Sequence, residues 1–557
     1  MAAPTEDSSR RPDTTDEAIV YDNFYSPENR LFYAKKPYKP LSPLDHEIRL
    51  LKLLPSGDDG ILSFTLLDNV PLASVDNRFT ALSYCAGNPR NTSRVIVNGL
   101  EFNVFANLGH AIREILTYWK KGDVVLEQQL LWIDQICIDQ SNPQERSHQV
   151  EMMKNIYAGA EKVLICLSEK ECSAFGLQFA IGLRKTLRIG LPAGDACRGM
   201  KWKGDKSKHA VCITAMESYY QSYEISGRST EVVADFRRLV KSSWWKRCWI
   251  CQEFIVARDA EFLYGGHFMN WMDFAQVVFH MMDIPSLAAR LCAKDLDSMD
   301  SMFILYWLLI KKRNMKELRE TCSGELTAWL NYGRDCESSD ARDKIFAFLG
   351  LASEEYNITP DYSPLTSLEA LLIQVSTRIV AVDKNLDLLL CSGREKNRPS
   401  RFNMLPTWVP DWRQIPYYVD ALYPKKISLT PPRVENSTKL MAEGFWLNNP
   451  ESSLIMAFTA AENKEQDPWI RFQKAWMLDE DDGLWYFPYT SALFKLKKVN
   501  SHWLLIEDVS KTWQPPREQI WDSSQPNPCS NLLNVALRGD VAWLLKQGLK
   551  REVIEIR

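Results

Sequence analysis

The sequence lacks the long apolar stretches that mark membrane-spanning and secreted proteins. A membrane-spanning helix needs ~20 apolar residues, whereas the best apolar run in these 557 residues, 302–310, ends at Lys311. Residues 1–17 are polar and acidic and contain no apolar signal core. We therefore expect no membrane partner, no secretion and a cytoplasmic location.

An excess of basic charge is also missing. The formal net charge is -4, so the chain has no global positive field that would attract a nucleic acid, and we expect no nucleic-acid partner. The 13 cysteines do not show the spacing of a disulfide framework, which favours reduced thiols.

Several motifs for cofactors and metals are absent. No GxxxxGK[ST] or GxGxxG occurs, which argues against a phosphate-binding loop of those types, and the seven histidines form no HExxH. Cys248 and Cys251 form a CxxC, but zinc would need a second pair of ligands at suitable spacing. We predict two core cysteines there, no metal and no resident cofactor.

The chain is rich in residues that need a packed interior. Its 19 tryptophans carry large apolar areas, and its length exceeds what one compact core supports. We predict a disordered tail and lead-in (1–40), an α/β domain (41–270), a helical region (271–430) and a small mixed α+β/β C-terminal module (431–557).

Strand-like and helix-like segments alternate through the predicted α/β domain. The apolar runs 79–84, 130–138, 163–167 and 261–264 have the length of buried strands. This alternation predicts a parallel sheet with helical crossovers, and ligands bind such sheets at the carboxyl ends of the strands.

Local signals predict where turns and helices begin. They are Asn98-Gly99 for a hairpin turn, Asn107 and Asp340 as N-caps, and Asn142 as the N-cap of a capping box completed by Glu145. We expect a further helix over about 230–258.

Three segments resemble the motifs of the fungal heterokaryon-incompatibility (HET) domain, in the family's order. They are ALSYCAGNP (81–89), LLWIDQICIDQSNPQERSHQVEMMKNIYAGAEKVLICL (130–167) and RCWICQEFIVA (247–257). Later segments extend the resemblance to about 44–415. Ala86 departs from the family, which usually has Trp there. Within the central motif we expect Arg146, Gln149 and Glu151 to form a charged solvent face.

HET domains are distantly similar to TIR (Toll/interleukin-receptor) domains, and this resemblance implies a TIR-like, flavodoxin-like α/β fold. The TIR helix with a Trp and a Glu four residues apart falls on Trp249 and Glu253. In enzymatic TIR domains that glutamate is the catalytic residue of NAD+ cleavage. The resemblance therefore implies Glu253 as the catalytic carboxylate, with Trp249 beside a bound nucleotide.

The residues themselves leave two interpretations of Glu253 open. It lies in an apolar run, 248–257, where a carboxylate has an expensive charged form and a raised pKa. The alternative is a surface or capping glutamate on a core helix. Ser83 and Tyr84 end the first predicted strand and Asp134 ends the apolar part of the second, so we expect them to line a nucleotide pocket at the ligand edge of the sheet. Alternatively, Tyr84 packs in the core and Asp134 caps a loop.

By resemblance, the biological role is non-self recognition and regulated cell death in a filamentous fungus, with NAD+ as a substrate and not a cofactor. A rival interpretation is a non-enzymatic signalling or scaffold protein that acts by self-association. A homo-oligomer and an unidentified incompatibility partner protein are the candidate partners. Glu253 opening into a pocket would favour the enzyme, and Glu253 in a surface ion pair would favour the scaffold.

Overall fold

The computed structural model describes most of the chain and divides it into two compact units. Unit 1 comprises 1–321 with 338–340 and 360–362, and unit 2 comprises the remainder. The described residues are 29–54, 60–190, 206–282, 284–292, 296–317, 325–392, 405–413, 431–448, 478–479, 481–488, 490, 493–508, 541–546 and 549–557. Residues 1–28 of the predicted tail and lead-in lie outside them. Residues 29–40 are described and include a short helix, Arg30–Ala34, with the buried Phe32, so this part of the disorder prediction was wrong.

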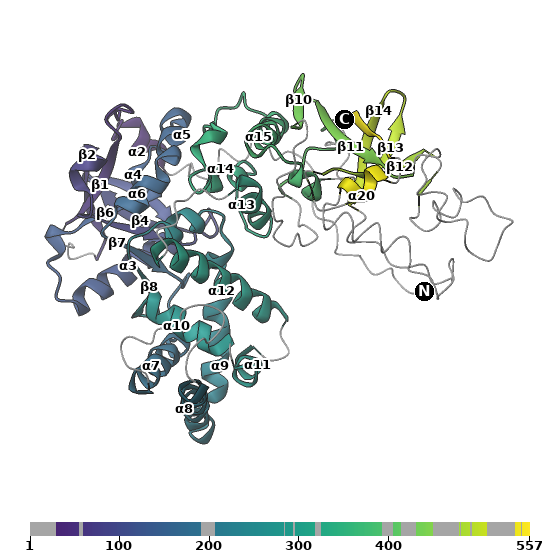
Figure 1. The fold of residues 1–557 in the computed structure, drawn as a ribbon. Helices are drawn as coiled ribbons and strands as arrows, with labels where there is room; N and C mark the ends of the chain where they lie inside the picture. Colours follow the sequence, from purple (N-terminus) through teal and green to yellow (C-terminus); the bar gives the residue numbers. More distant parts are fainter. Residues whose placement is uncertain are drawn as a thin grey trace, which may run out of the picture. The chain divides into compact units, whose positions relative to one another are not determined.

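Unit 1 is built around one mixed sheet (Figure 1). Its described strands are β1 (Glu47–Leu53), β2 (Ser63–Pro71), β3 (Thr80–Ser83), β4 (Thr92–Val97), β5 (Leu100–Phe105), β6 (Leu130–Trp132), β7 (Lys162–Cys166), β8 (Ala260–Tyr264) and β9 (His267–Asn270). Their order across the sheet is β5-β4-β2-β1-β6-β3-β7-β8-β9.

Four neighbouring strands at the centre of this sheet, β6, β3, β7 and β8, run parallel. Counted along the chain, their spatial order is second, first, third, fourth, which is the doubly-wound order with a switch point between the first and third strands. The α/β prediction is confirmed. The expected parallel sheet is mixed, however, because β1 and β9 flank this core in antiparallel pairing.

Described helices surround the sheet of unit 1 and continue beyond it. They are α2 (Arg30–Ala34), α3 (Ala106–Lys121), α4 (Asp134–Cys137), α5 (Pro143–Glu151), α6 (Met153–Gly159), α7 (Phe175–Gly190), α8 (Lys206–Ile225), α9 (Ser229–Val240), α10 (Trp271–Met282), α11 (Pro285–Cys292) and α12 (Leu296–Glu317). Within the described residues, no helix combines the length and hydropathy needed to cross a membrane.

The crossovers place helices on both faces of the parallel core. Helix α3 connects the hairpin β4–β5 to β6 and contacts β7 and β8. Helix α6 belongs to the next crossover, which runs in the opposite direction across the sheet. Because crossovers are right-handed, α3 and α6 cover opposite faces.

The turn and cap predictions had mixed outcomes. Asn98 and Gly99 both have positive φ and join β4 to β5, as predicted. The Asn142 side chain accepts from the N–H groups of Gln144 and Glu145, which confirms the N-cap. Glu145 does not complete a capping box, because its carboxylate instead accepts from the Asp139 N–H group.

Two other cap predictions were wrong. Helix α3 begins at Ala106 without a side-chain cap, and Asn107 donates instead to the carbonyl of Cys85. The helix after Asp340 is α14 (Asp343–Leu349), whose N-cap position is Arg342, and the Asp340 carboxylate lies in an ion pair with Arg146.

Two predicted elements end earlier than the sequence suggests. The expected strand 130–138 stops at Trp132, and α4 follows. The expected helix 230–258 divides into α9, a 3-10 helix η4 (Ser243–Lys246) and a π-helix η5 (Cys251–Ile255). The break matters because Glu253 lies in the π-helix.

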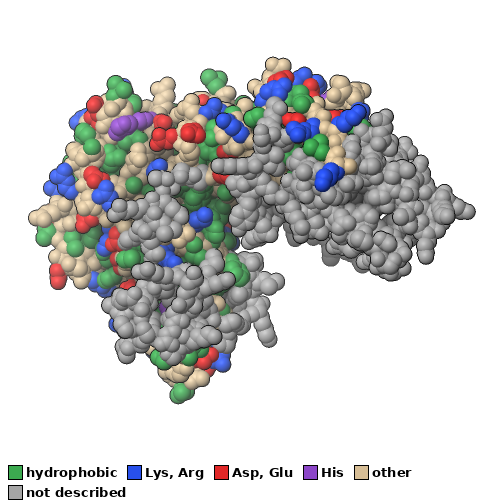
Figure 2. Space-filling model, in the orientation of Figure 1, with side chains coloured by type: hydrophobic (Ala, Val, Ile, Leu, Met, Phe, Trp, Pro, Cys, Tyr) green, Lys and Arg blue, Asp and Glu red, His purple; other side chains and the backbone are tan. Residues whose placement is uncertain are grey.

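Charges of both signs are interspersed on the described surface drawn in Figure 2. This distribution agrees with the small net charge of -4.

Unit 2 contains helices and a second sheet. Its described helices include α13 (Leu326–Gly333), α14, α15 (Leu368–Asp383) and α20 (Val541–Lys546). The described strands are β10 (Arg433–Glu435), β11 (Lys439–Trp446), β12 (Asp482–Tyr486), β13 (Leu493–Val499), β14 (His502–Asp508) and β15 (Arg551–Ile556). Because β15 pairs with both β14 and β11, strands β11 to β15 close into a small barrel.

Candidate functional site

A polar cluster lies at the carboxyl end of β3, beside the switch point of the parallel strands. Ser83 is the last residue of β3, and its hydroxyl donates to the Oε2 atom of Glu253. The indole Nε1 of Trp244 donates to the same hydroxyl at 2.7 Å. Ser83 therefore joins the end of the strand to the π-helix.

Glu253 is buried and bound to a guanidinium group. Its residue is 1% exposed, and Arg247 donates from Nη1 to Oε2 at 3.1 Å and from Nη2 to Oε1 at 3.2 Å. Burial raises the pKa of Glu253, Arg247 and the Ser83 hydroxyl oppose this rise, and the nearby Asp134 adds to it. The sequence-based interpretations expected Glu253 either to open into a pocket or to lie in a surface ion pair. The observed ion pair with Arg247 is buried and matches neither arrangement.

Asp134 and Tyr84 form the second part of the cluster. Asp134 opens α4 two residues after β6. Burial raises the pKa of the Tyr84 hydroxyl, and the negative charge of the nearby Asp134 raises it further. Burial raises the pKa of Asp134, and the charge of Arg247 lowers it. Burial alone would lower the pKa of Arg247. The neighbouring acidic groups, of which Glu253 has the largest effect, raise the pKa overall. Arg247 is thus ion-paired with Glu253, and its charge also acts on the nearby Asp134.

Trp249 contributes differently from what its spacing suggested. Its carbonyl accepts from the N–H groups of Gln252 and Glu253, each at 3.0 Å, and its side chain is half-buried. These contacts place its backbone against Glu253 at the start of the π-helix. The predicted role of the indole ring beside a nucleotide stays a prediction.

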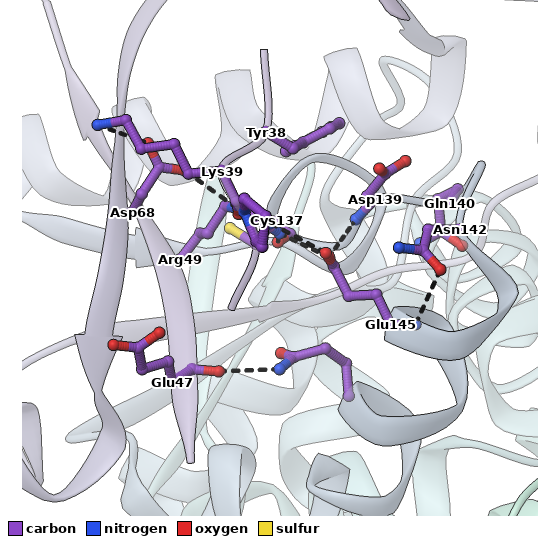
Figure 3. A network of polar contacts seen from close by, with 12 residues as sticks. Tyr38, Lys39, Glu47, Arg49, Asp68, Cys137, Asp139, Gln140, Asn142 and Glu145 are labelled. Atoms are coloured by element: carbon purple, nitrogen blue, oxygen red, sulfur yellow. Dashed lines mark hydrogen bonds and ion pairs between the residues drawn. The ribbon is translucent and has the colours of Figure 1, made fainter. Parts of the chain in front are cut away.

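The loop that carries Asp134 is held by a buried arginine (Figure 3). Arg49 of β1 is 0% exposed, and its guanidinium group donates to Asp68, to the carbonyls of Lys39 and Cys137, and to both carboxylate oxygens of Glu145. All five of its N–H groups are used. Cys137 ends α4, so Arg49 fixes the short helix that Asp134 begins.

Sequence reasoning missed several members of this site. Arg247 is the cation that the cluster requires, while Trp244 and Tyr157 are buried beside it. The Tyr157 hydroxyl donates to the carbonyl of Leu82 at 3.0 Å. Arg247 opens the third family-like segment, so a basic residue beside a buried glutamate was the signal available.

The predicted charged face of the central motif was wrong for two of its three residues. Arg146 is 8% and Gln149 0% exposed. Arg146 stacks on the ring of Tyr362 at 3.7 Å, and Gln149 donates to the carbonyl of Glu47. Only Glu151 is exposed. Segments distant in sequence cover this helix face.

The described residues include no group of three or more His, Cys, Asp or Glu side chains arranged to hold a metal. Cys248 and Cys251 are buried free thiols, as predicted. The carboxyl, guanidinium and hydroxyl groups of the cluster are suited to acid, base and electrostatic effects. Two carboxyl groups can stabilise a developing positive charge, while a guanidinium and hydroxyl groups orient them.

Comparison with known proteins finds a family match over the segment that contains the cluster. Residues 79–253 match the family model described as heterokaryon incompatibility protein (HET), a span that begins just before β3 and ends at Glu253. Heterokaryon incompatibility protein 6, OR allele, of Neurospora crassa is 26% identical over 416 residues, which cover 67% of this chain and 58% of the relative. No solved structure matches the chain. The chain therefore carries a segment, residues 79–253, that matches the HET domain.

Proposed function

We propose that the HET domain cleaves the nicotinamide–ribose bond of NAD+, with Glu253 as the catalytic carboxylate. One observation carries the proposal: a buried glutamate is hydrogen-bonded to the end of a parallel strand at the switch point, with a second carboxyl group nearby. Open α/β sheets bind ligands at this edge. The doubly-wound order of the four parallel strands also supports a TIR-like fold.

The reaction needs little from the protein beyond one well-placed negative charge. The glycosidic bond breaks with its electron pair moving to the pyridinium nitrogen, so nicotinamide leaves as a neutral molecule. Positive charge grows on the ribose, and a nearby carboxylate stabilises it. Water then bonds to the anomeric carbon and loses a proton, for which the Glu253 carboxylate is the proposed acceptor.

The resting ion pair gives Arg247 a specific part in this proposal. Its side chain is 18% exposed, whereas that of Glu253 is 1% exposed, so substrate would reach the carboxylate from the arginine's side. The guanidinium occupies both oxygens of Glu253 in this structure. Binding would exchange that contact for contacts to the ribose, and Arg247 would keep the carboxyl group ionised until then.

The remaining predicted site residues take supporting roles. Ser83 holds one carboxylate oxygen in place, and Trp244 orients the Ser83 hydroxyl. Tyr84 and Asp134, which interact electrostatically, would face the nucleotide. Trp249 would stack against a planar part of the substrate. Together these residues would line the nucleotide site.

The test is the identity of the products. Purified full-length protein is incubated with NAD+, and nicotinamide and ADP-ribose are detected by mass spectrometry. The proposal expects both products in equal amounts from the wild type and neither above background from Glu253→Gln. NAD+ that stays intact with assembled wild-type protein would refute the enzyme.

The biological role we propose is non-self recognition leading to regulated cell death. It is supported by the HET domain and by the name of the Neurospora relative. An incompatibility partner protein or assembly into a homo-oligomer would act as the trigger. The cytoplasm, where NAD+ is available, is the proposed location.

A scaffold function is the second candidate, and the Arg247–Glu253 pair is also compatible with it. A buried ion pair is also what a purely structural latch between η4 and η5 looks like. In that case Glu253→Gln would alter stability or self-association without any NAD+ being consumed. Light scattering on wild type and variant distinguishes this outcome from loss of catalysis.

A further inference from the structure

A buried lysine from a helix outside the family-matched segment closes the end of the π-helix. Lys312 of α12 is 1% exposed. Its Nζ atom donates to the carbonyl of Phe254 at 2.6 Å and to that of Ala257 at 2.7 Å. Phe254 is the residue directly after Glu253.

Aromatic rings complete the surroundings of this ammonium group. Nζ lies 4.8 Å from the centre of the Phe254 ring and 4.9 Å from that of Trp271. A buried ammonium group is costly unless such contacts replace its hydration. The lysine therefore occupies a site built to hold a cation.

The contacts of Lys312 lie at the carboxyl end of the π-helix η5. The last carbonyls of a helix lack intrahelical donors, and a cation at that end is stabilised by the helix dipole. A π-helix is rare and occurs mostly as a single turn, frequently at functional sites. With η5 held by Trp249 and Ser83 on one side, Lys312 holds the other end of the turn that carries Glu253.

We propose that Lys312 is a positioning residue for Glu253, so that the working unit of this HET domain extends beyond residue 253 to include α12. The catalytic part of this inference rests on the proposed function. Its structural part, that Lys312 sets the geometry of residues 251–257, does not depend on it.

The test compares Lys312→Met with Lys312→Arg and with the neighbouring control Lys311→Met in the full chain. Methionine keeps the apolar stem and removes the donor, whereas arginine can donate to both carbonyls and stack on the rings. The Nζ atom of Lys311 lies over the ring of Trp307, 5.2 Å from its centre. Hydrogen exchange of the backbone amides and nicotinamide release are measured for each variant.

We expect Lys312→Met to speed exchange selectively in 251–257 and to lower kcat by about 10- to 100-fold with little change in KM, because a small misplacement of a reacting group has effects of this size. Lys312→Arg should restore both, and Lys311→Met should match the wild type. Wild-type exchange and kcat in Lys312→Met, or faster exchange spread evenly over unit 1, would overturn the proposal.

Two arrangements keep the test decisive. If Lys312→Met is unfolded at the assay temperature, Lys312→Gln, which keeps an N–H donor without the charge, replaces it under the same criteria. If the wild type releases no nicotinamide, the proposed function fails, while selective exchange in 251–257 still decides whether Lys312 holds the turn.

Discussion

Replacing Arg49 by methionine should be among the most destabilising single changes in unit 1. The change removes a guanidinium group that is 0% exposed and leaves the side chains of Glu145 and Asp68, 8% and 9% exposed, without their buried cation. Breaking a buried ion pair by removing one partner costs about 3–5 kcal/mol. At about 2–4 °C per kcal/mol, the unfolding transition of unit 1 should fall by roughly 6–20 °C.

Arg94→Met is the matched control for this change. Arg94 pairs with Glu101 at 2.8 Å, but both side chains are exposed, at 51% and 66%. Solvent-exposed pairs contribute about 0–1 kcal/mol, so this variant should melt close to the wild type. Differential scanning calorimetry measures both. An Arg49→Met protein that melts no lower than Arg94→Met would refute the view that this network holds the α4 loop.

Three further outcomes follow from the buried ionisable groups. Burial, followed by the charges of Glu325 and Asp383, raises the pKa of Asp387 to about 7. Between about pH 4 and 7 the folded state therefore binds more protons than the unfolded state. Unit 2 should lose stability as the pH rises through this window. Asp387→Asn should flatten that dependence in thermal melts and raise the melting temperature at pH 8; an unchanged pH profile would contradict it. Burial also raises the pKa values of Cys137 and Cys166 to about 12, so iodoacetamide at pH 8 should label them only after unfolding, and rapid labelling of native protein, read by peptide mass spectrometry, would count against their burial. Glu253→Gln should stay folded, because Gln can still accept from Ser83, and circular dichroism that matched an unfolded chain would contradict this.

The sequence predicted those parts of the fold that depend on local patterns. The runs around β3, β7 and β8 were found within one or two residues, because short apolar segments between turn signals are typical of buried strands. Asn98-Gly99 and Asn142 also act where they were expected, since each works through its own neighbouring backbone.

The errors arose where distant segments decide the structure. The run 248–257 is apolar except for Gln252 and Glu253 and offers no signal for a π-helix, whose end is held by Lys312 from far along the chain. Arg49 and Glu145 are 96 residues apart, so their pairing has no local signature. Arg146 was expected in solvent and is covered by Tyr362 instead. The candidate residues Ser83 and Glu253 do meet, but the ion pair of Glu253 with Arg247 was not foreseen.

The most direct test of the account is the rate of nicotinamide release by Glu253→Gln relative to Glu261→Gln. Glu261 of β8 is also buried, at 7% exposure, and pairs with Lys162 of β7 rather than with a residue of the cluster. Loss of an electrostatic stabiliser of the transition state costs about 10²–10³-fold in rate. We predict a loss of that size for Glu253→Gln and a rate near that of the wild type for Glu261→Gln. Equal release by wild type and Glu253→Gln would contradict the claim that this carboxylate performs the reaction.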